Sequence, residues 1–274
     1  MNKIIFLLLL ILIISCNSST KIEIQNDNIK TSELETFQSK SLKENIPYKI
    51  IFPENFEIKK DSLSLLVLLD GDDYSGIAEN VTSLYEFGDK IYPTVIISLP
   101  STKESRWTHY TPTKDTTKIE KGFEDLYSRT GKFNEFADFV GNELIPSVEN
   151  KYNINFNQKT IFGHSLGGLG VLSFAVLRPE IFENYISASP STMYDQHFIF
   201  KTIEKNGNLN FNSMFITAGL NDANGYRENV VWLNEYLDKH KSENQKVGMK
   251  IYDNENHSTS GLKSIIDGIE FIGK

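Results

Sequence analysis

A glycine-rich turn around Ser165 is the feature that most restricts the fold of this sequence. Residues 159–162 (KTIF) are typical of a short β-strand, and residues 169–177 are typical of a helix. Between them, positions 163–168 read GHSLGG, which contains the pattern Gly-x-Ser-x-Gly. A strand, a sharp turn and a helix form the context of a nucleophile elbow, in which the serine hydroxyl projects above the edge of a sheet. The sequence therefore predicts Ser165 as a nucleophile.

The residue types of this turn agree with that chemistry. The serine of an elbow has a strained backbone, and neighbouring glycines let other backbone approach without a Cβ. The amide of Leu166 is expected at the N-terminus of the following helix, where an oxyanion can be held. We therefore expect the Leu166 N–H to be one donor of an oxyanion hole.

Strands and helices alternate along most of the chain. Continuous apolar runs at 63–69 (LSLLVLL) and 94–99 (TVIISL) predict strands that are buried on both faces. Apolar residues at helical spacing predict an amphipathic helix from 133 to 148. Further strands are expected at 33–43, 48–52, 184–188, 213–218 and 247–252, with helices at 77–87, 226–240 and 262–272 and a helix or loop near 193–206. The pattern predicts an α/β protein with a mostly parallel, doubly wound sheet and helices on both faces.

The general base is sought at the carboxyl ends of the strands, because sites in doubly wound sheets lie there. A serine hydroxyl is a poor nucleophile until a base takes its proton. His257 follows the last predicted strand, on a polar loop before the final helix, which satisfies the chain order Ser…acid…His. His164 is expected to point away from Ser165, and His240 lies in a charged helix end. We therefore predict His257 as the base.

Asp222 is the predicted acid of this triad. It follows the strand at 213–218 and lies between Ser165 and His257 in the sequence. An acid at this point would hold the imidazole tautomer and stabilise the imidazolium. Glu228, which begins the following helix, is the alternative, whereas Asp253 belongs to the last strand itself.

A second oxyanion donor is expected from the loop after the strand at 63–69. That loop reads Asp70-Gly71-Asp72, and we predict the amide of Asp72 as the donor. Two carboxylates beside a developing oxyanion are unfavourable. Their side chains must therefore point outward, or toward a basic substrate group or Arg106.

The segment from 101 to 132 is polar, irregular and too long for a plain connection. Long loops of this kind in compact domains are usually functional. We expect three of its residues, Arg106, Trp107 and Tyr110, to shape the acyl or alcohol pocket.

The composition limits the classes of function. The 274 residues are 39% hydrophobic, which fits one large α/β domain or two small ones. The formal charge is −8, and no basic cluster is visible, which excludes a typical nucleic-acid binder. His and Asp residues show no metal-ligand spacing, and neither a metal nor an organic cofactor is expected.

The first residues predict export. Positions 4–14 are an unbroken apolar run behind a short basic start, too short to span a membrane but typical of a signal peptide. The run ends in an apolar pair and a small residue before Cys16, the only cysteine of the chain. This arrangement resembles a bacterial lipobox, which implies cleavage before Cys16 and lipid attachment to it.

The expected domain organisation follows from this N-terminus. Residues 1–15 are predicted to be the signal peptide, 16–32 a polar tether and 33–274 the hydrolase domain. We expect a lipoprotein anchored to a membrane through its lipid alone and facing the periplasm or the cell surface.

Several segments together resemble the putative-esterase family of α/β-hydrolases, which includes esterase D, mycolyltransferases and ferric siderophore esterases. The resemblance spans roughly residues 34–274 and favours the branch that is similar to siderophore esterases. It rests on LLDG at 68–71, RWTHYTP at 106–112, FADFVGNELIPSVENKY at 136–152, the elbow at 163–168 and SPS at 189–191. It implies an α/β-hydrolase fold, the nucleophile Ser165, the base His257 and the oxyanion-hole amides of Leu166 and Asp72.

Two positions depart from the pattern of that family. Met193-Tyr194 stands where the family often has Trp, and His109 stands where it usually has Asp. Both positions are expected on the substrate side, and Tyr194 is a predicted substrate contact. Some members of the family manage with a Ser-His pair, so the resemblance leaves the role of Asp222 open.

The sequence therefore predicts a serine esterase that forms an acyl-enzyme on Ser165. Its substrate would be a small-molecule or glycan ester, with siderophore lactones and acylated glycans among the candidates. The alternatives are an acyltransferase with the same residues and a catalytically silent binding protein on a hydrolase scaffold.

Overall fold

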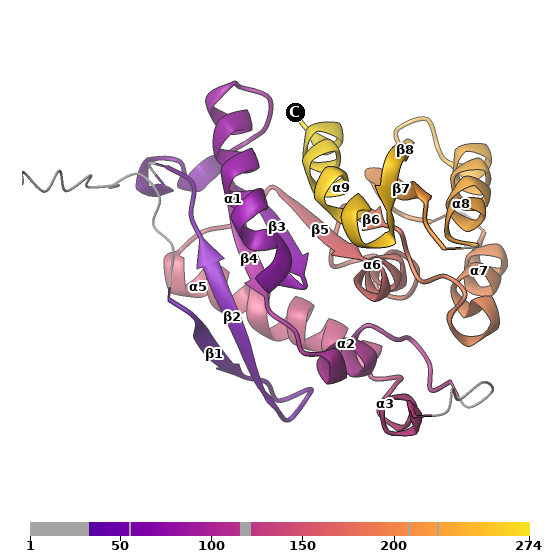
Figure 1. Cartoon of the computed structure of the whole chain (residues 1–274). Helices are drawn as coiled ribbons and strands as arrows, with labels where there is room; N and C mark the ends of the chain where they lie inside the picture. Colours follow the sequence, from indigo (N-terminus) through magenta and orange to yellow (C-terminus); the bar gives the residue numbers. More distant parts are fainter. Residues whose placement is uncertain (1–32, 55, 116–121, 208, 224) are drawn as a thin grey trace, which may run out of the picture.

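The computed structural model describes residues 33–54, 56–115, 122–207, 209–223 and 225–274 (Figure 1). The predicted signal peptide, the tether and Cys16 lie outside these residues. The strands are β1 (Glu35–Gln38), β2 (Asn45–Ile51), β3 (Ser64–Leu69), β4 (Thr94–Leu99), β5 (Gln158–His164), β6 (Asn184–Ala188), β7 (Ser213–Asn221) and β8 (Lys246–Asn256). They form an 8-stranded sheet in the order β1-β2-β4-β3-β5-β6-β7-β8.

The pairing of the strands confirms the predicted fold class. β1 pairs with β2, and β2 with β4, in antiparallel fashion, whereas the pairs from β4 to β8 are parallel. The apolar runs form central strands, as expected, because every residue of β3 and β4 after the first is buried. The parallel order brings the carboxyl ends of β5, β6, β7 and β8 to one edge of the sheet.

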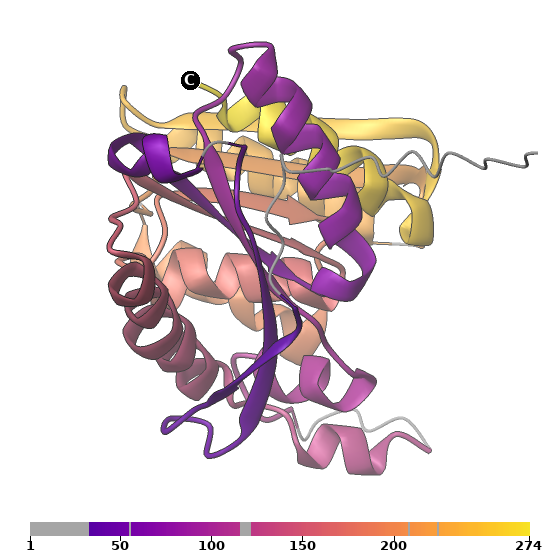
Figure 2. The same ribbon diagram turned by 90° about the vertical axis from the view of Figure 1, so that its left-hand side faces the viewer.

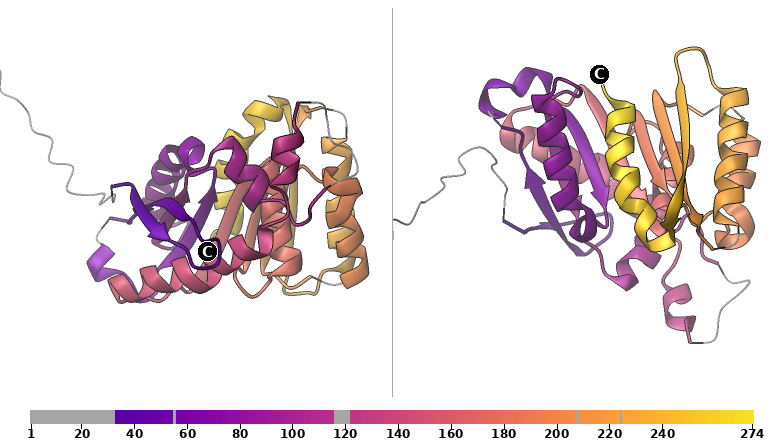
Figure 3. Two further views of the ribbon diagram at one scale, coloured as in Figure 1. Left: turned by 90° about the horizontal axis from the view of Figure 1, so that it is seen from below. Right: turned by 45° about the horizontal axis from the view of Figure 1, so that its top comes forward.

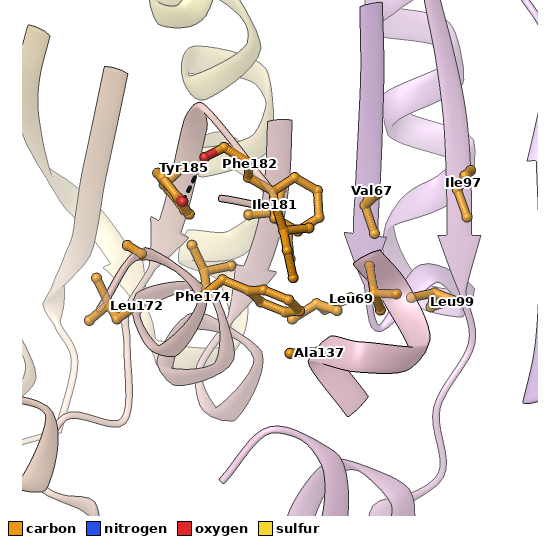
Figure 4. Packing of buried hydrophobic residues seen from close by; sticks show 14 of the residues in the cluster. Val67, Leu69, Ile97, Leu99, Ala137, Leu172, Phe174, Ile181, Phe182 and Tyr185 are labelled. Carbon is orange, nitrogen blue, oxygen red and sulfur yellow. Dashed lines mark hydrogen bonds between the residues drawn. The ribbon is translucent and has the colours of Figure 1, made fainter. Parts of the chain in front are cut away.

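Helices cover both faces of the sheet (Figure 2). The main ones are α1 (Gly71–Phe87), α4 (Phe133–Asp138), α5 (Ile145–Tyr152), α6 (Leu166–Leu177), α7 (Tyr194–Asn206), α8 (Tyr226–His240) and α9 (His257–Ile272). Helices α1 and α9 lie side by side on one face (Figure 3), where Ala78 and Ile265 join the core on that side. The larger core lies on the other face. There Phe174 of α6 and Ala137 of α4 pack near Leu69 of the sheet (Figure 4).

Three predictions of helix position were wrong because the first turns of these helices are polar or glycine-containing, and an apolar pattern does not reveal them. The segment 101–132 was expected to be irregular. It holds α2 (Lys103–His109), which the Thr102 side chain caps, and α3 (Glu124–Ser128), and Figure 1 shows both below the sheet. Helix α1 begins at Gly71 instead of 77, and α9 begins at His257 instead of 262.

The predicted helix from 133 to 148 is helical throughout but is not uniform. A π-helical segment, η3 (Phe139–Leu144), separates α4 from α5, and the helical region runs on to Tyr152. None of the described helices is both long enough and apolar enough to cross a membrane.

Candidate active site

Ser165 lies in a sharp turn between β5 and α6, as the sequence predicts. Its backbone has φ 59° and ψ −116°, a conformation that residues other than glycine rarely adopt. The turn is held because the Ser165 N–H donates to the Ala188 carbonyl (2.9 Å) and the Ser165 carbonyl accepts from the Leu169 N–H (3.0 Å). A Cβ on Gly163 would collide with the Gly167 carbonyl, so the glycine requirement comes from close backbone approach.

The imidazole of His257 contacts the serine hydroxyl directly. Its Nε2 lies 2.8 Å from Ser165 Oγ. His257 is the first residue of α9 rather than a loop residue, because Asn256 caps that helix by accepting from the Ser258 N–H (3.0 Å). The helix start therefore fixes the backbone of the candidate base at the edge of the sheet.

Asp222 occupies the position expected for the acid. Its Oδ1 lies 3.2 Å from His257 Nδ1, and its side chain is 0% exposed. Its Oδ2 accepts from Ser189 Oγ (2.7 Å) and from the Gly219 N–H (3.0 Å). Burial alone would raise the pKa of Asp222, but these hydrogen bonds and the one from His257 hold the pKa below its usual value. The carboxyl is therefore held as a carboxylate.

Glu228, the alternative acid, has another role. Its Oε2 accepts from the Gly225 N–H at the start of α8 (3.1 Å), and its Oε1 accepts from Arg227 (2.6 Å). Its side chain is exposed, which is typical of a capping residue. Among the described residues, Asp222 is thus the carboxylate that contacts the imidazole.

A buried pair of serines supports the acid and the base from behind. Ser189 is 0% exposed and has φ 39°, and its hydroxyl donates to Asp222. Its Oγ lies 2.8 Å from Ser260 Oγ, and Ser260 Oγ donates to the His257 carbonyl (3.3 Å). Ser189 belongs to the SPS segment at 189–191, so this part of the motif orients the acid.

His164 of the elbow packs against His257. The two ring centroids are 5.0 Å apart, and the Tyr74 ring lies 6.3 Å from His164 on another side. Burial, with a smaller contribution from His257, lowers the pKa of His164 to about 4. His164 is thus a neutral packing residue beside the base.

Two helix N-termini meet near the elbow. Leu166 is the first residue of α6, and Asp72 is the second residue of α1. Backbone N–H groups in the first turn of a helix have no acceptor within that helix. Asp70 Oδ2 lies against the first turn of α6, since it would be 2.9 Å from a Cβ on Gly167. The arrangement suits an oxyanion hole, and the Asp72 amide stays a prediction.

The carboxylate of Asp70 is turned to Arg106, one of the orientations expected from the sequence. Arg106 Nε donates to Asp70 Oδ1 (2.8 Å), and Arg106 Nη2 donates to the His164 carbonyl (3.3 Å). Ser101 Oγ also donates to Asp70 Oδ1 (2.5 Å). Burial raises the pKa of Asp70, and Arg106 and Ser101 oppose that rise. This network fixes the loop between β3 and α1 to the elbow.

A pocket of about 670 Å³ opens over Ser165. Three of the predicted substrate contacts, Arg106, Trp107 and Tyr194, line it. Tyr110 does not line it. Its side chain is 2% exposed in the core, where its hydroxyl accepts from the Asp70 N–H (3.3 Å). Tyr110 was predicted from its neighbours in a polar loop, but it is the C-cap of α2 and faces inward.

The family of the chain follows from a comparison with known sequences. The model of the family described as "Putative esterase" matches residues 39–264. The chain belongs to this esterase family. It is 30% identical over 132 residues, 46% of its length, to the apo-salmochelin esterase of Escherichia coli O6:H1, and the match covers 41% of that protein. It is 44% identical over 66 residues, 24% of its length, to the ferri-bacillibactin esterase BesA of Bacillus subtilis, with 23% of that protein covered. These matches span less than half the length of each relative.

Solved structures show the same fold over most of this chain. An IroE-like serine hydrolase from Shewanella oneidensis superposes with a TM-score of 0.77 at 22% identity, covering 88% of this chain and 79% of that one. The BES protein from Bacillus cereus gives a TM-score of 0.75 at 22% identity, covering 89% and 96%. The fold is therefore that of the α/β-hydrolases.

Two residues of the candidate site were not predicted from the sequence. Ser191 Oγ lies 3.4 Å from Ser165 Oγ, and Tyr226 OH lies 3.3 Å from Ser191 Oγ. The SPS segment was a signal for Ser191. Tyr226 had no such signal, because it reads only as the start of a helix.

The positions that depart from the family pattern lie in different surroundings. Tyr194 lines the pocket, where its hydroxyl donates to the Thr113 carbonyl (2.7 Å). The three residues after it, from Asp195 to His197, all have positive φ and line the same pocket. His109 is buried, and its ring stacks on Phe136 with centroids 5.3 Å apart. It does not line the pocket over Ser165, contrary to the expectation that this position faces the substrate.

The chemistry available at the site is acyl transfer. The part of the chain that the structure describes has no group of three or more His, Cys, Asp or Glu residues that could hold a metal ion. A hydroxyl, an imidazole and a carboxylate in hydrogen-bonded sequence are instead the groups that nucleophilic catalysis at a carbonyl requires.

Proposed function

We propose that this chain is a serine esterase that cleaves carboxylic esters through an acyl-enzyme on Ser165. The observation that carries the proposal is the contact of Ser165 Oγ with His257 Nε2 (2.8 Å), with Asp222 buried behind the imidazole. Membership of the esterase family supports it.

The first half of the reaction forms the acyl-enzyme. Ser165 Oγ attacks the ester carbonyl as its proton passes to His257 Nε2. The carbonyl oxygen becomes an oxyanion, which the amides of Leu166 and Asp72 would hold. Each such donor typically contributes on the order of 10²–10³ in rate. His257 then returns the proton to the leaving alcohol as the C–O bond breaks, and Asp222 stabilises the imidazolium in between.

The second half repeats these steps with water. Water attacks the acyl carbonyl, its proton passes to His257 Nε2, and the bond between the carbonyl carbon and Ser165 Oγ breaks as the proton returns to the serine. The products are a carboxylic acid and the free enzyme. None of these steps uses a cofactor.

The proposed substrates are siderophore esters or acylated glycans. The names of two relatives, apo-salmochelin esterase and ferri-bacillibactin esterase, support the first class. The pocket of about 670 Å³ is in the usual range for small-molecule sites, and Trp107 and Tyr194 give it aromatic walls. Arg106 provides a cation in the same wall for an anionic or oxygen-rich group.

We further propose that the protein is exported and anchored by lipid at Cys16. This rests on the apolar run at 4–14 and on the residues before Cys16. Replacing Cys16 with Ser should move the protein from the membrane fraction to the soluble fraction. A variant that stays in the membrane fraction would refute the anchor without touching the esterase proposal.

Hydrolysis of p-nitrophenyl acetate and butyrate tests the proposed reaction. Wild-type protein should release p-nitrophenol, and Ser165→Ala should abolish the release. Ser173→Ala is the matched control, because Ser173 is also on α6 but is buried and bonds to the Leu169 carbonyl (2.8 Å). If activity survives in Ser165→Ala, the elbow is not the site.

A further inference from the structure

Two hydroxyl groups beside Ser165 have no part in the mechanism above. Ser191 Oγ lies 3.4 Å from Ser165 Oγ and 3.3 Å from Tyr226 OH. The Tyr226 ring lies over His257, with centroids 4.4 Å apart and planes at 48°. Ser165, Ser191 and Tyr226 all line the same pocket. The pair therefore borders both the nucleophile and the base.

The surrounding structure fixes these hydroxyls in place without using them. The Ser191 N–H donates to the Ser165 carbonyl (3.0 Å), which ties the Ser191 backbone to the elbow. Asn229 of α8 donates to Thr192 Oγ1 (3.0 Å), which ties the first turn of α8 to the same loop. Loss of either hydroxyl would leave both of these bonds intact.

The mechanism places a third oxygen beside the nucleophile and the base. The leaving alcohol takes its proton from His257 Nε2, and the attacking water gives its proton to the same nitrogen. By microscopic reversibility, these two oxygens occupy the same side of the acyl carbon. Hydroxyl groups suit an alcohol or water, because each can donate and accept a hydrogen bond.

We propose that Ser191 and Tyr226 form a hydroxyl-binding subsite, which holds the leaving alcohol in the first half-reaction and the attacking water or alcohol in the second. This inference rests on the proposed esterase function. In the first half, Tyr226 or Ser191 donates a hydrogen bond to the alkoxide oxygen while the C–O bond breaks and the proton from His257 Nε2 arrives. In the second half, the same hydroxyls accept from an incoming water, whose other proton passes to His257. An incoming alcohol gives its single proton to His257 and accepts a hydrogen bond from the hydroxyls instead.

The subsite predicts a dependence on the leaving group that a structural role would not produce. p-Nitrophenolate is a weak base and leaves without help, whereas an alkoxide needs stabilisation as negative charge develops on its oxygen. A hydrogen bond that is lost at the alkoxide costs about tenfold in rate, the equivalent of 1.4 kcal/mol. The loss should therefore grow with the basicity of the leaving alcohol.

The experiment measures kcat/KM for a series of butyrate esters with p-nitrophenyl, phenyl, trifluoroethyl and ethyl leaving groups. The variants are Tyr226→Phe and Ser191→Ala. Tyr236→Phe is the control, because Tyr236 lies on the same helix and bonds to the Ile203 carbonyl outside the pocket. In Tyr226→Phe we expect kcat/KM to fall about tenfold for ethyl butyrate and progressively less toward p-nitrophenyl butyrate, while Tyr236→Phe shows no such gradient.

The outcomes separate this inference from the proposed function. Equal losses of kcat/KM across the whole series, or no loss in either variant, would overturn the subsite. The esterase proposal would stand in that case, as long as wild type hydrolyses the esters through Ser165. A wild-type protein that cleaves none of the esters through Ser165 would overturn both.

Discussion

His257 Nε2 lies 2.8 Å from Ser165 Oγ, although 92 positions separate the two residues in the sequence. The parallel sheet creates this contact, because β5 ends at the elbow and β8 ends just before His257 on the same edge. Both side chains are fixed by helix starts rather than by long loops. The site is therefore preorganised for proton transfer, and the predictions below test its parts.

Asp222→Asn should reduce kcat strongly while the fold is kept. An amide in place of the carboxylate favours the wrong imidazole tautomer, which costs about 10⁴ in a serine protease triad. We expect a loss of about 10²–10⁴ in kcat for p-nitrophenyl butyrate, measured with the unfolding midpoint as a check on the fold. Glu228→Gln is the control and should stay within about twofold of wild type. Equal effects of the two changes would contradict the assignment of the acid.

Ser189→Ala should reduce the contribution of Asp222 to catalysis without removing its carboxyl group. The hydrogen bond from Ser189 Oγ is one of those that keep the pKa of Asp222 low. Without that bond the pKa of Asp222 rises, so the carboxylate is lost at a higher pH than in wild type. We expect kcat to fall about tenfold, and its decline toward low pH to begin at a higher pH. An unchanged pH profile would mean that Ser189 serves the fold alone, and Ser189→Thr should restore part of the loss.

Arg106→Ala should destabilise the fold by leaving the Asp70 carboxylate unpaired. Asp70 is 4% exposed at the side chain and Arg106 is 31% exposed, so solvent screens the pair in part. We expect a loss of about 2 kcal/mol in the free energy of unfolding, measured by urea titration. Asp70→Asn added to Arg106→Ala should recover much of this loss. A double variant less stable than Arg106→Ala alone would argue that the charge of Asp70 is not the cause.

The protein should become less stable as the pH is lowered, because His164 binds a proton more readily in the unfolded chain. Its pKa is about 4 in the folded protein, below the ordinary value of 6.5, so the unfolded chain binds a proton first as the pH falls. The contribution of neutral His164 to the free energy of unfolding is about 3 kcal/mol. It is complete above about pH 6.5 and is lost as the pH falls to about 4. His257, Arg106 and Asp222 influence the same group.

His164→Asn isolates that contribution because the amide does not titrate. The free energy of unfolding should decline less in the variant than in wild type between pH 7 and pH 4.5. Parallel curves for the two proteins would show that His164 does not set the difference.

Much of the site could be predicted from the sequence because local rules determine it. The elbow is a strand, a glycine turn and a helix in direct succession, which identifies Ser165 from adjacent residues alone. His257 and Asp222 follow from the ends of β8 and β7, since parallel strands bring their carboxyl ends together. The turning of Asp70 toward Arg106 was among the options that charge alone left open.

The remaining features depend on contacts between distant segments. Tyr110 has polar neighbours in the sequence, but its ring packs in the core against Phe136, which is distant in the sequence, with ring centroids 5.6 Å apart. Tyr226 lies at the start of α8, which the hydrogen bond from Asn229 to Thr192 ties to the loop after β6. Neither relationship leaves a periodic or local signal in the sequence.

The measurement that tests the central claim most directly is labelling with a fluorophosphonate, followed by peptide mapping. Such a reagent phosphonylates a serine only when a base activates its hydroxyl. Wild type should gain the mass of one adduct, located on Ser165, and lose esterase activity in parallel, whereas His257→Ala should label far more slowly. An adduct on another residue, or full activity after Ser165 is labelled, would contradict the account.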